Sequence, residues 1–191
     1  MNIGIKDDDF IRGKVPMTKE EIRILTLVKA KISPSATVYD VGAGTGSISI
    51  EAARLAPHGH VYAIEKNPEG IKLITENAKH FRAENITVIE GAAPEALSGL
   101  PPIDAAIVGG SGQRLEEILD VLSERIRPNG RIVMNAITMQ TVAACLDYFR
   151  THGDSYTYEA IQVQINRLER VGSYDMAKAL NPIYIITAER N

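Results

Sequence analysis

The stretch Val38-Tyr39-Asp40-Val41-Gly42-Ala43-Gly44-Thr45-Gly46-Ser47 decides how this chain folds. Its apolar first half predicts a β-strand, its three glycines predict a tight turn, and residues Ser47 to Leu55 predict a helix. Glycine lets the backbone turn sharply and lets a ligand come close to the main chain. A strand, a glycine turn and a helix in this order are typical of a nucleotide-type cofactor site.

The spacing of the glycines separates two classes of cofactor. A dinucleotide-binding turn has the pattern G-x-G-x-x-G, with a pyrophosphate at the helix N-terminus. Here the third glycine comes one residue earlier, which gives G-x-G-x-G behind an acidic residue. This variant resembles the first motif of class I S-adenosylmethionine-dependent methyltransferases, where no pyrophosphate has to be held. The residues expected to contact the cofactor are Asp40, Gly42, Ala43, Gly44, Thr45 and Gly46.

A second anchor for the cofactor lies at the end of the next predicted strand. Residues 60–64 form a short apolar strand, and Glu65 follows it directly. A carboxylate at this place can accept hydrogen bonds from both ribose hydroxyls, so we favour this role over that of a plain surface charge. The role of Asp40 stays open, since it can anchor the glycine turn or face the ligand's amino group through water.

Length and composition favour one cytoplasmic domain. With 191 residues, of which 45% are hydrophobic, the chain can bury a substantial core, and we expect a single domain over residues 1–191. The first 14 residues lack the apolar segment of a signal peptide, and no later run reaches the roughly 18 apolar residues of a membrane span. We therefore expect no membrane partner.

Charge and cysteine content exclude further classes. A net charge of -3 argues against a protein that grips nucleic acid by its phosphates. The single cysteine, Cys145, falls in an apolar helical pattern, which predicts a buried structural thiol. The four histidines do not have the spacing of metal ligands, so we predict no metal site.

Strands and helices alternate along most of the chain. The predicted strands are Thr37–Val41, Val61–Glu65, Ile86–Glu90, Ile103–Val108 and Arg131–Ala136, and the predicted helices are Ser47–Leu55, Pro68–Arg82, Leu115–Ile126 and Met139–Thr151. Pro128-Asn129-Gly130 predicts a turn before the last of these strands. Tyr156 to Leu168 then alternates apolar and polar residues, and Pro182 to Thr187 predicts another strand. The sheet is therefore expected to close with an antiparallel pair.

An N-terminal segment and helix, residues 1–33, are expected to cover the cofactor cleft. Thr18 and Glu21 have the spacing of a capping box, which predicts a helix start after Pro16-Met17. The apolar face of this helix is expected from residues at helical spacing, namely Ile22, Leu25, Val28 and Ile32.

The order of the elements predicts an α/β fold of the Rossmann-like class I methyltransferase type. It has a seven-stranded, mostly parallel sheet with a terminal antiparallel hairpin and helices on both faces, whereas a dinucleotide domain would continue with parallel strands. The motifs then meet at the carboxyl edge of the sheet, beside the switch between its first and fourth strands. Gly91-Ala92-Ala93-Pro94 would lie beside the adenine, and Gly109-Gly110-Ser111-Gly112 beside the transferable methyl group.

The motif after the fourth strand bears on the substrate. Methyltransferases that act on amino groups of bases often carry Asp/Asn-Pro-Pro-aromatic there, whereas this chain has three glycines and a serine. Asn181-Pro182-Ile183-Tyr184 is superficially similar but begins the last strand, where a turn is the better interpretation. The three glycines fit either close approach by a flat, bulky substrate or a flexible loop.

Nearly the whole chain resembles one family, the decarboxylating cobalt-precorrin-6B carbon-15 methyltransferases of vitamin B12 biosynthesis. The most specific elements are Pro16-Met17-Thr18-Lys19 and Gly109-Gly110-Ser111-Gly112. The others are Gly4-Ile5, Asp7-Asp8-Asp9-Phe10, the glycine turn, Glu90 to Leu97 and Asn181-Pro182. The family commonly has an acid where this chain has Ala92, so adenine recognition would depend on backbone amides or on another side chain.

The resemblance implies S-adenosylmethionine as cofactor and methylation of a tetrapyrrole carbon with loss of carbon dioxide from an acetate side chain. It implies that Thr18 contacts the cofactor, as would Ala92 and Ala93, that the glycine loop contacts the substrate, and that the protein is a homotetramer. The protein chiefly aligns the two reactants, so we assign no catalytic acid or base. Cationic groups for a polycarboxylated substrate could come from Arg12, Lys14, Arg114 and Arg167.

Two alternatives stay open. One is another class I methyltransferase, acting on tRNA adenine or protein isoaspartate; the acidic net charge and the motif after the fourth strand disfavour tRNA. The other is a catalytically inactive cofactor-binding domain that serves as an assembly partner, which the intact cofactor anchors disfavour.

Overall fold

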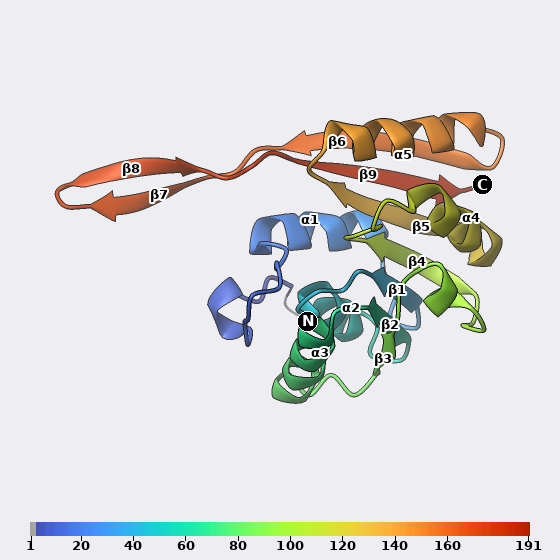
Figure 1. Cartoon of the computed structure of the whole chain (residues 1–191), viewed down its shortest axis with the longest axis horizontal. Helices are drawn as coiled ribbons and strands as arrows, with labels where there is room; N and C mark the ends of the chain where they lie inside the picture. Colours follow the sequence, from blue (N-terminus) through green and yellow to red (C-terminus); the bar gives the residue numbers. More distant parts are fainter. Residues whose placement is uncertain (1–2) are drawn as a thin grey trace.

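The computed structural model describes residues 3–191, which form two sheets (Figure 1). The main sheet has seven strands in the order β3 (Ile86–Glu90), β2 (His60–Glu65), β1 (Thr37–Val41), β4 (Ile103–Val108), β5 (Ile126–Ala136), β9 (Ile183–Arg190) and β6 (Tyr156–Val163). The second sheet pairs β7 (Asn166–Val171) with β8 (Tyr174–Ala179).

Strand pairing confirms the predicted fold class. Strands β1 to β5 pair in parallel, while β9 runs antiparallel to both β5 and β6. The chain moves from β1 to β2 and β3 on one side and to β4 and β5 on the other. The strand order therefore reverses between β1 and β4, which is where ligands of open α/β sheets bind.

Helices cover both faces of the main sheet and build two apolar cores. The helices are α1 (Glu20–Ala30), α2 (Ser47–Leu55), α3 (Pro68–His80), α4 (Leu115–Arg125) and α5 (Met139–Thr151). Side chains of α4 and α5 pack in one core, and those of α1 and α2 pack in the other, with α3 beside α2. Successive β1 residues alternate between the two cores, Val38 on one face and Tyr39 on the other. Burial on both faces explains why the parallel strands are almost wholly apolar.

Cys145 lies in the α4–α5 core and is fully buried, as predicted. Its Sγ is 3.1 Å from Sδ of Met134, and burial raises the pKa of the thiol to about 12. No helix in the described part of the chain is long and apolar enough to span a membrane. Residues 3–191 contain no cluster of histidine, cysteine or carboxylate side chains able to hold a metal ion.

The predicted capping box of the first helix and one residue of its predicted apolar face were wrong. Helix α1 begins at Glu20 with Lys19 as its N-cap, and no side chain caps it, so Thr18 and Glu21 form no capping box. Val28 is 59% exposed, whereas Arg23 and Leu27 are buried. Ile22 is buried, and Leu25 and Ile32 pack against the same core, so only Val28 was misplaced. The apolar pattern could not reveal that α1 also packs a charged side chain inward.

The predicted boundary between the fourth long helix and the fifth strand was also displaced. Helix α4 ends at Arg125, and β5 begins at Ile126 rather than at Arg131. The predicted turn lies inside the bounds of β5, where Asn129 has a positive φ of 62° and the pairing with β4 is irregular. A distorted strand thus replaces a separate turn.

The predicted single strand from Tyr156 to Leu168 is broken. Its pairing with β9 ends at Val163 opposite Ile183, and the chain then leaves the main sheet at Gln164. Strands β7 and β8 pair only with each other and extend away from the rest of the molecule (Figure 1). Alternation of apolar and polar residues predicts a strand but not its partner, so this hairpin was missed.

Candidate active site

A cavity of about 720 Å³ lies at the carboxyl edge of the main sheet, beside the β1–β4 switch. Its volume is in the usual range for small-molecule sites, roughly 300 to 1,000 Å³. Most of the predicted contact residues line it, namely Thr18, Asp40, Gly42, Ala43, Gly44, Glu65, Ala92, Ala93, Gly109, Gly110, Ser111 and Gly112. Segments far apart in the sequence are thus brought to one site.

Thr45 and Gly46 belong to the same predicted set but do not line the cavity. Thr45 is 1% exposed, and its carbonyl oxygen accepts a hydrogen bond from Nδ2 of Asn77 at 3.0 Å. Gly46 is the N-cap of α2, and a Cβ there would lie 3.1 Å from the Ile74 side chain. Both residues contact α3 and so support the turn without facing the cavity.

The glycines of the turn are required by contacts within the protein. Gly42 has a φ of +73°, and a Cβ there would lie 2.9 Å from backbone atoms of Gly110. Gly44 has a φ of +59°, and its Cβ would lie 3.0 Å from the carbonyl oxygen of Pro16. Side chains are disfavoured in this backbone region as well. The turn therefore packs against the loop after β4 and against the N-terminal segment, rather than only making room for a ligand.

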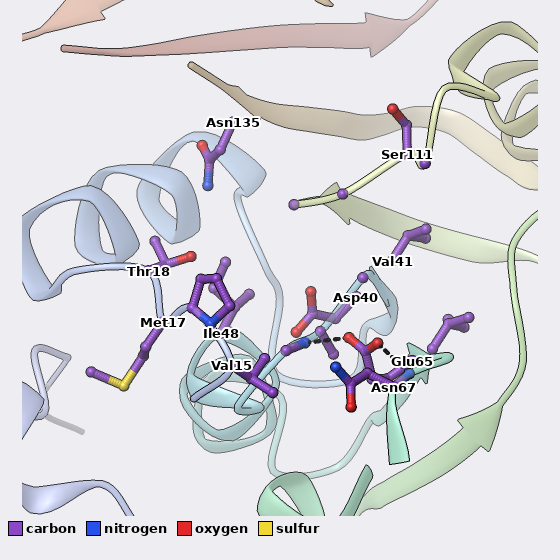
Figure 2. Close-up of a pocket in the computed structure, with 18 of the residues that line it drawn as sticks. Val15, Met17, Thr18, Asp40, Val41, Ile48, Glu65, Asn67, Ser111 and Asn135 are labelled. Carbon is purple, nitrogen blue, oxygen red and sulfur yellow. Dashed lines mark hydrogen bonds between the residues drawn. The ribbon is translucent and has the colours of Figure 1, made fainter. Parts of the chain in front are cut away.

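Three backbone amides orient the carboxylate of Glu65 (Figure 2). Its Oε2 accepts from the Gly44 amide at 2.8 Å, and its Oε1 accepts from the amides of Lys66 and Asn67 at 2.9 and 2.8 Å. A carboxylate offers about four acceptor positions, so capacity remains for a ligand. Glu65 lines the cavity and is only 8% exposed, which strengthens hydrogen bonds made there.

Asp40 is buried behind the glycine turn. Its Oδ2 accepts a hydrogen bond of 2.5 Å from the hydroxyl of Ser49 in α2, and the residue is 1% exposed. Burial raises the pKa of Asp40 to about 6, although the bond to Ser49 opposes that shift. Asp40 thus anchors the start of α2 through Ser49, and it also lines the cavity.

The N-terminal segment closes one side of the cavity, where residues 15–19 line it. Side chains of α2 and α3 hold this segment through its main chain. Glu51 accepts from the amides of Gly4 and Ile5, Asn77 bonds the amide and carbonyl of Ile11, and Glu69 accepts from the amide of Lys14. The cover is therefore attached to the helices that follow the glycine turn and β2.

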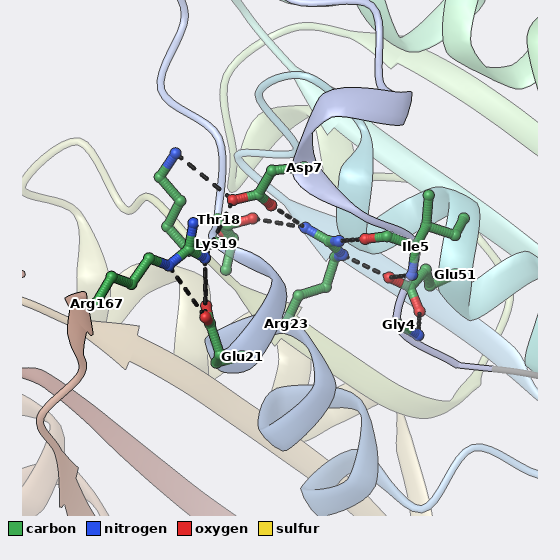
Figure 3. Close-up of polar contacts among 9 residues, drawn as sticks. All are labelled: Gly4, Ile5, Asp7, Thr18, Lys19, Glu21, Arg23, Glu51 and Arg167. Carbon is green, nitrogen blue, oxygen red and sulfur yellow. Dashed lines mark hydrogen bonds and ion pairs between the residues drawn. The ribbon is translucent and has the colours of Figure 1, made fainter. Parts of the chain in front are cut away.

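Arg23 is the centre of a buried ionic network beneath this cover (Figure 3). The guanidinium donates to Oε1 of Glu51 at 2.6 Å, to the carbonyl oxygen of Thr18 at 2.8 Å, and also to Asp7 and the Ile5 carbonyl. Sequence reasoning missed this network, since an arginine in an amphipathic helix is normally a surface charge.

Of the four cationic candidates, only Arg114 lines the cavity. It is paired with Glu95 at 2.7 Å and with Glu117 at 2.5 Å, so its charge is already compensated. Arg167 pairs with Glu21 at 2.8 Å, outside the cavity. Polar residues outside the predicted contact set line it as well, among them Lys19, Lys66, Asn135 and Asn181.

The sequence matches a protein family described as "Precorrin methyltransferase domain" over residues 9–190. A protein of Sulfolobus acidocaldarius named probable cobalt-precorrin-6B C(15)-methyltransferase (decarboxylating) is 41% identical over 190 residues, covering 98% of this chain and 97% of that protein. The cobalt-precorrin-6B C(15)-methyltransferase (decarboxylating) of Salmonella typhimurium is 37% identical, covering 97% of this chain and 96% of its own.

A solved structure supports the same comparison. The precorrin-6y C5,15-methyltransferase of Geobacter metallireducens superposes with a TM-score of 0.92 at 41% identity, over 98% of both chains. The fold expected from the order of strands and helices is therefore that of a solved methyltransferase.

Proposed function

The chain belongs to the precorrin methyltransferase family, and from this premise we propose that it methylates carbon 15 of cobalt-precorrin-6B and removes carbon dioxide from an acetate side chain. The observation that carries the proposal is the meeting of three motifs in one cavity. These are the glycine turn, the oriented carboxylate of Glu65 and the glycine loop after β4. This arrangement occurs in a chain that matches its relatives along almost its whole length.

S-adenosylmethionine is the cofactor in this proposal, and it supplies an activated methyl group when bound. Glu65 would accept hydrogen bonds from the ribose, and the main chain of Gly42, Ala43 and Gly44 would border the methionine part. Ala92 and Ala93 would offer backbone groups to the adenine. Thr18 would contact the cofactor from the N-terminal segment and helix that we propose as its cover. Of this segment, residues 1–33, the structure describes residues 3–33. The whole chain would form a single domain. Asp40 would act mainly by fixing the turn, with Thr45 and Gly46 behind it.

The loop Gly109-Gly110-Ser111-Gly112 would border the tetrapyrrole. A Cβ on Gly110 would meet nothing within 4 Å, so this side of the loop is open to a flat substrate. The contribution of the protein is to hold the macrocycle carbon in line with the methyl group. No side chain is assigned as a general acid or base.

We also propose that the protein works in the cytoplasm and has no nucleic acid or membrane partner. It would assemble as a homotetramer through the β7–β8 hairpin. Four large apolar side chains of this hairpin are more than half exposed, namely Leu168, Val171, Tyr174 and Met176. An isolated two-stranded hairpin is marginally stable in water. Pairing with the same hairpin of other copies would bury these side chains.

The test is incubation of the protein with S-adenosylmethionine and cobalt-precorrin-6B, followed by mass spectrometry of the tetrapyrrole. We expect a product that has gained one methyl group and lost one carbon dioxide. In parallel, calorimetry should show binding of S-adenosylmethionine but not of a nicotinamide dinucleotide. Glu65→Ala should weaken that binding by about 1 to 3 kcal/mol. A methylated product that keeps its carboxyl group, or methylation of tRNA instead, would contradict the proposal.

A further inference from the structure

Three cationic residues line the active-site cavity in the described part of the chain, namely Lys19, Lys66 and Arg114. Two of them already have acidic partners within the protein. Nζ of Lys19 lies 3.6 Å from Oδ2 of Asp7, and Arg114 is paired with two glutamates. Lys66 is exposed and, within residues 3–191, forms no ion pair and no side-chain hydrogen bond. Its positive charge is therefore available to a ligand.

The fold brings the ammonium group of Lys66 beside the loop after β4. Lys66 follows β2 directly, and its amide donates to Oε1 of Glu65 at 2.9 Å. Strand β1 lies between β2 and β4, so at the usual strand spacing the ends of β2 and β4 are about 10 Å apart. A Cβ on Gly112, in the loop after β4, would nevertheless lie 3.5 Å from Nζ of Lys66. The side chain and the loop therefore meet across the end of β1, where the glycine turn begins.

The other charges of the cavity wall make this cation important for an acidic ligand. The loop Gly109-Gly110-Ser111-Gly112 has no charged side chain, and the carboxylate of Glu65 lines the same cavity. A carboxylate that enters beside the loop is repelled by Glu65, and this repulsion is stronger in a site with little water. Lys66 supplies the uncompensated positive charge that offsets it.

We propose that Lys66 binds a carboxylate side chain of the tetrapyrrole, beside the loop after β4. This inference rests on the proposed function, which supplies a polycarboxylated macrocycle. The carboxylate that Lys66 holds is one that the product keeps, because a paired cation stabilises the ionised carboxylate and so opposes its loss as carbon dioxide. Lys66 therefore contributes equally to the binding of the substrate and of the transition state.

Lys66→Met tests the inference, because it removes the charge and keeps an unbranched side chain of similar length. The measurement is titration of cobalt-precorrin-6B into protein loaded with S-adenosylhomocysteine, followed by absorbance. We expect the Kd for the tetrapyrrole to rise about five- to tenfold, and at least about 30-fold in Lys66→Glu, which reverses the charge. Lys66→Arg keeps the charge and should stay within about threefold of the wild type. The loss in Lys66→Met should shrink at high salt, since salt screens an exposed ion pair.

Two further readouts separate binding of the tetrapyrrole from other roles. In turnover assays, Lys66→Met should raise the KM for the tetrapyrrole and change kcat less than about twofold, as expected for a residue that binds substrate and transition state equally. The Kd for S-adenosylmethionine, measured by calorimetry, should also change less than about twofold, which is less than about 0.4 kcal/mol.

Lys72→Glu is the matched control for the reversal of charge. Lys72 is on α3, its side chain is 74% exposed, and it does not line the cavity. The inference would be overturned by equal weakening in this control, by an unchanged tetrapyrrole Kd in Lys66→Met and Lys66→Glu, or by a loss confined to kcat or to S-adenosylmethionine binding. In each of these cases the wild-type protein still binds and converts the tetrapyrrole, so the proposed function stands. Failure of the wild-type protein to bind the tetrapyrrole would remove both.

Discussion

The cofactor end of the main sheet and the β7–β8 hairpin differ in whether their side chains find partners within the chain. Around the glycine turn, buried charges and main-chain groups are bonded to partners within the chain, with Arg23 and Glu65 as centres. On the hairpin, Leu168 and Tyr174 are each 74% exposed. The first region can therefore form from the chain alone, whereas the second has the surface of an element that needs a partner.

The largest expected effect is on the cofactor end, through Arg23→Ala. Loss of the guanidinium leaves Glu51 and Asp7 without their buried partner, so we expect the free energy of unfolding to fall by about 3 to 5 kcal/mol. Chemical denaturation measures this free energy of unfolding. Arg150→Ala is the control, since Arg150 forms only an exposed pair with Asp147 and should cost less than about 1 kcal/mol. Equal losses in both variants would contradict the buried network.

Gly44→Val should abolish cofactor binding. A branched side chain at a φ of +59° would strain the backbone and displace Pro16, whose carbonyl oxygen lies 3.0 Å from the added Cβ. We expect the Kd for S-adenosylmethionine to rise at least about 100-fold, or about 3 kcal/mol, by calorimetry. Gly99→Val is the control, because Gly99 has a φ of +75° with nothing within 4 Å of an added Cβ. Normal binding by Gly44→Val would refute the role of the turn.

A charge on the hairpin should act on assembly and leave the cofactor end intact. The double variant Leu168→Lys with Tyr174→Lys places two charges on the exposed apolar surface. We expect it to weaken self-association by at least about 2 kcal/mol and to give smaller species in light scattering. Val28→Lys is the control, since Val28 is 59% exposed but lies on α1. An unchanged mass of the hairpin variant would exclude the hairpin as the interface.

The smallest effect concerns an ionic link between the two regions, the pair of Arg167 of β7 with Glu21 of α1 at 2.8 Å, beside which Arg167 also lies 3.6 Å from Asp7. This pair is 40% and 37% exposed at its side chains, so Arg167→Ala should cost less than about 1 kcal/mol at pH 7. The hydrogen bond from Arg167 lowers the pKa of Glu21 below its usual 4.5. The contribution is therefore present above that value and is lost as the pH falls through the lowered pKa. Unfolding at pH 7 and at pH 3 should show the difference between variant and wild type shrinking.

Local patterns were enough to predict much of the main sheet. Strand β1, the glycine turn and α2 were predicted with the bounds that the structure has, and so was the switch between β1 and β4. Apart from Thr18, the predicted contact residues that line the cavity lie at or just after strand ends, which parallel strands bring to one edge. Sequence reasoning failed where a residue's environment is set by distant segments, as for Arg23 and for three of the four cationic candidates.

What the sequence by itself determined is the alternation of strands and helices and the position of the turn, because apolar periodicity and glycine conformation act over a few residues. Tertiary structure alone decided which groups meet. Asn135 contacts Thr26 across 109 positions, and Gly42 is required to be small by the backbone of Gly110. Tertiary structure also decided that the chain leaves the main sheet after Val163, because the pattern of a strand does not determine which strand it pairs with. Such contacts depend on packing between segments, which leaves no periodic signal in the chain.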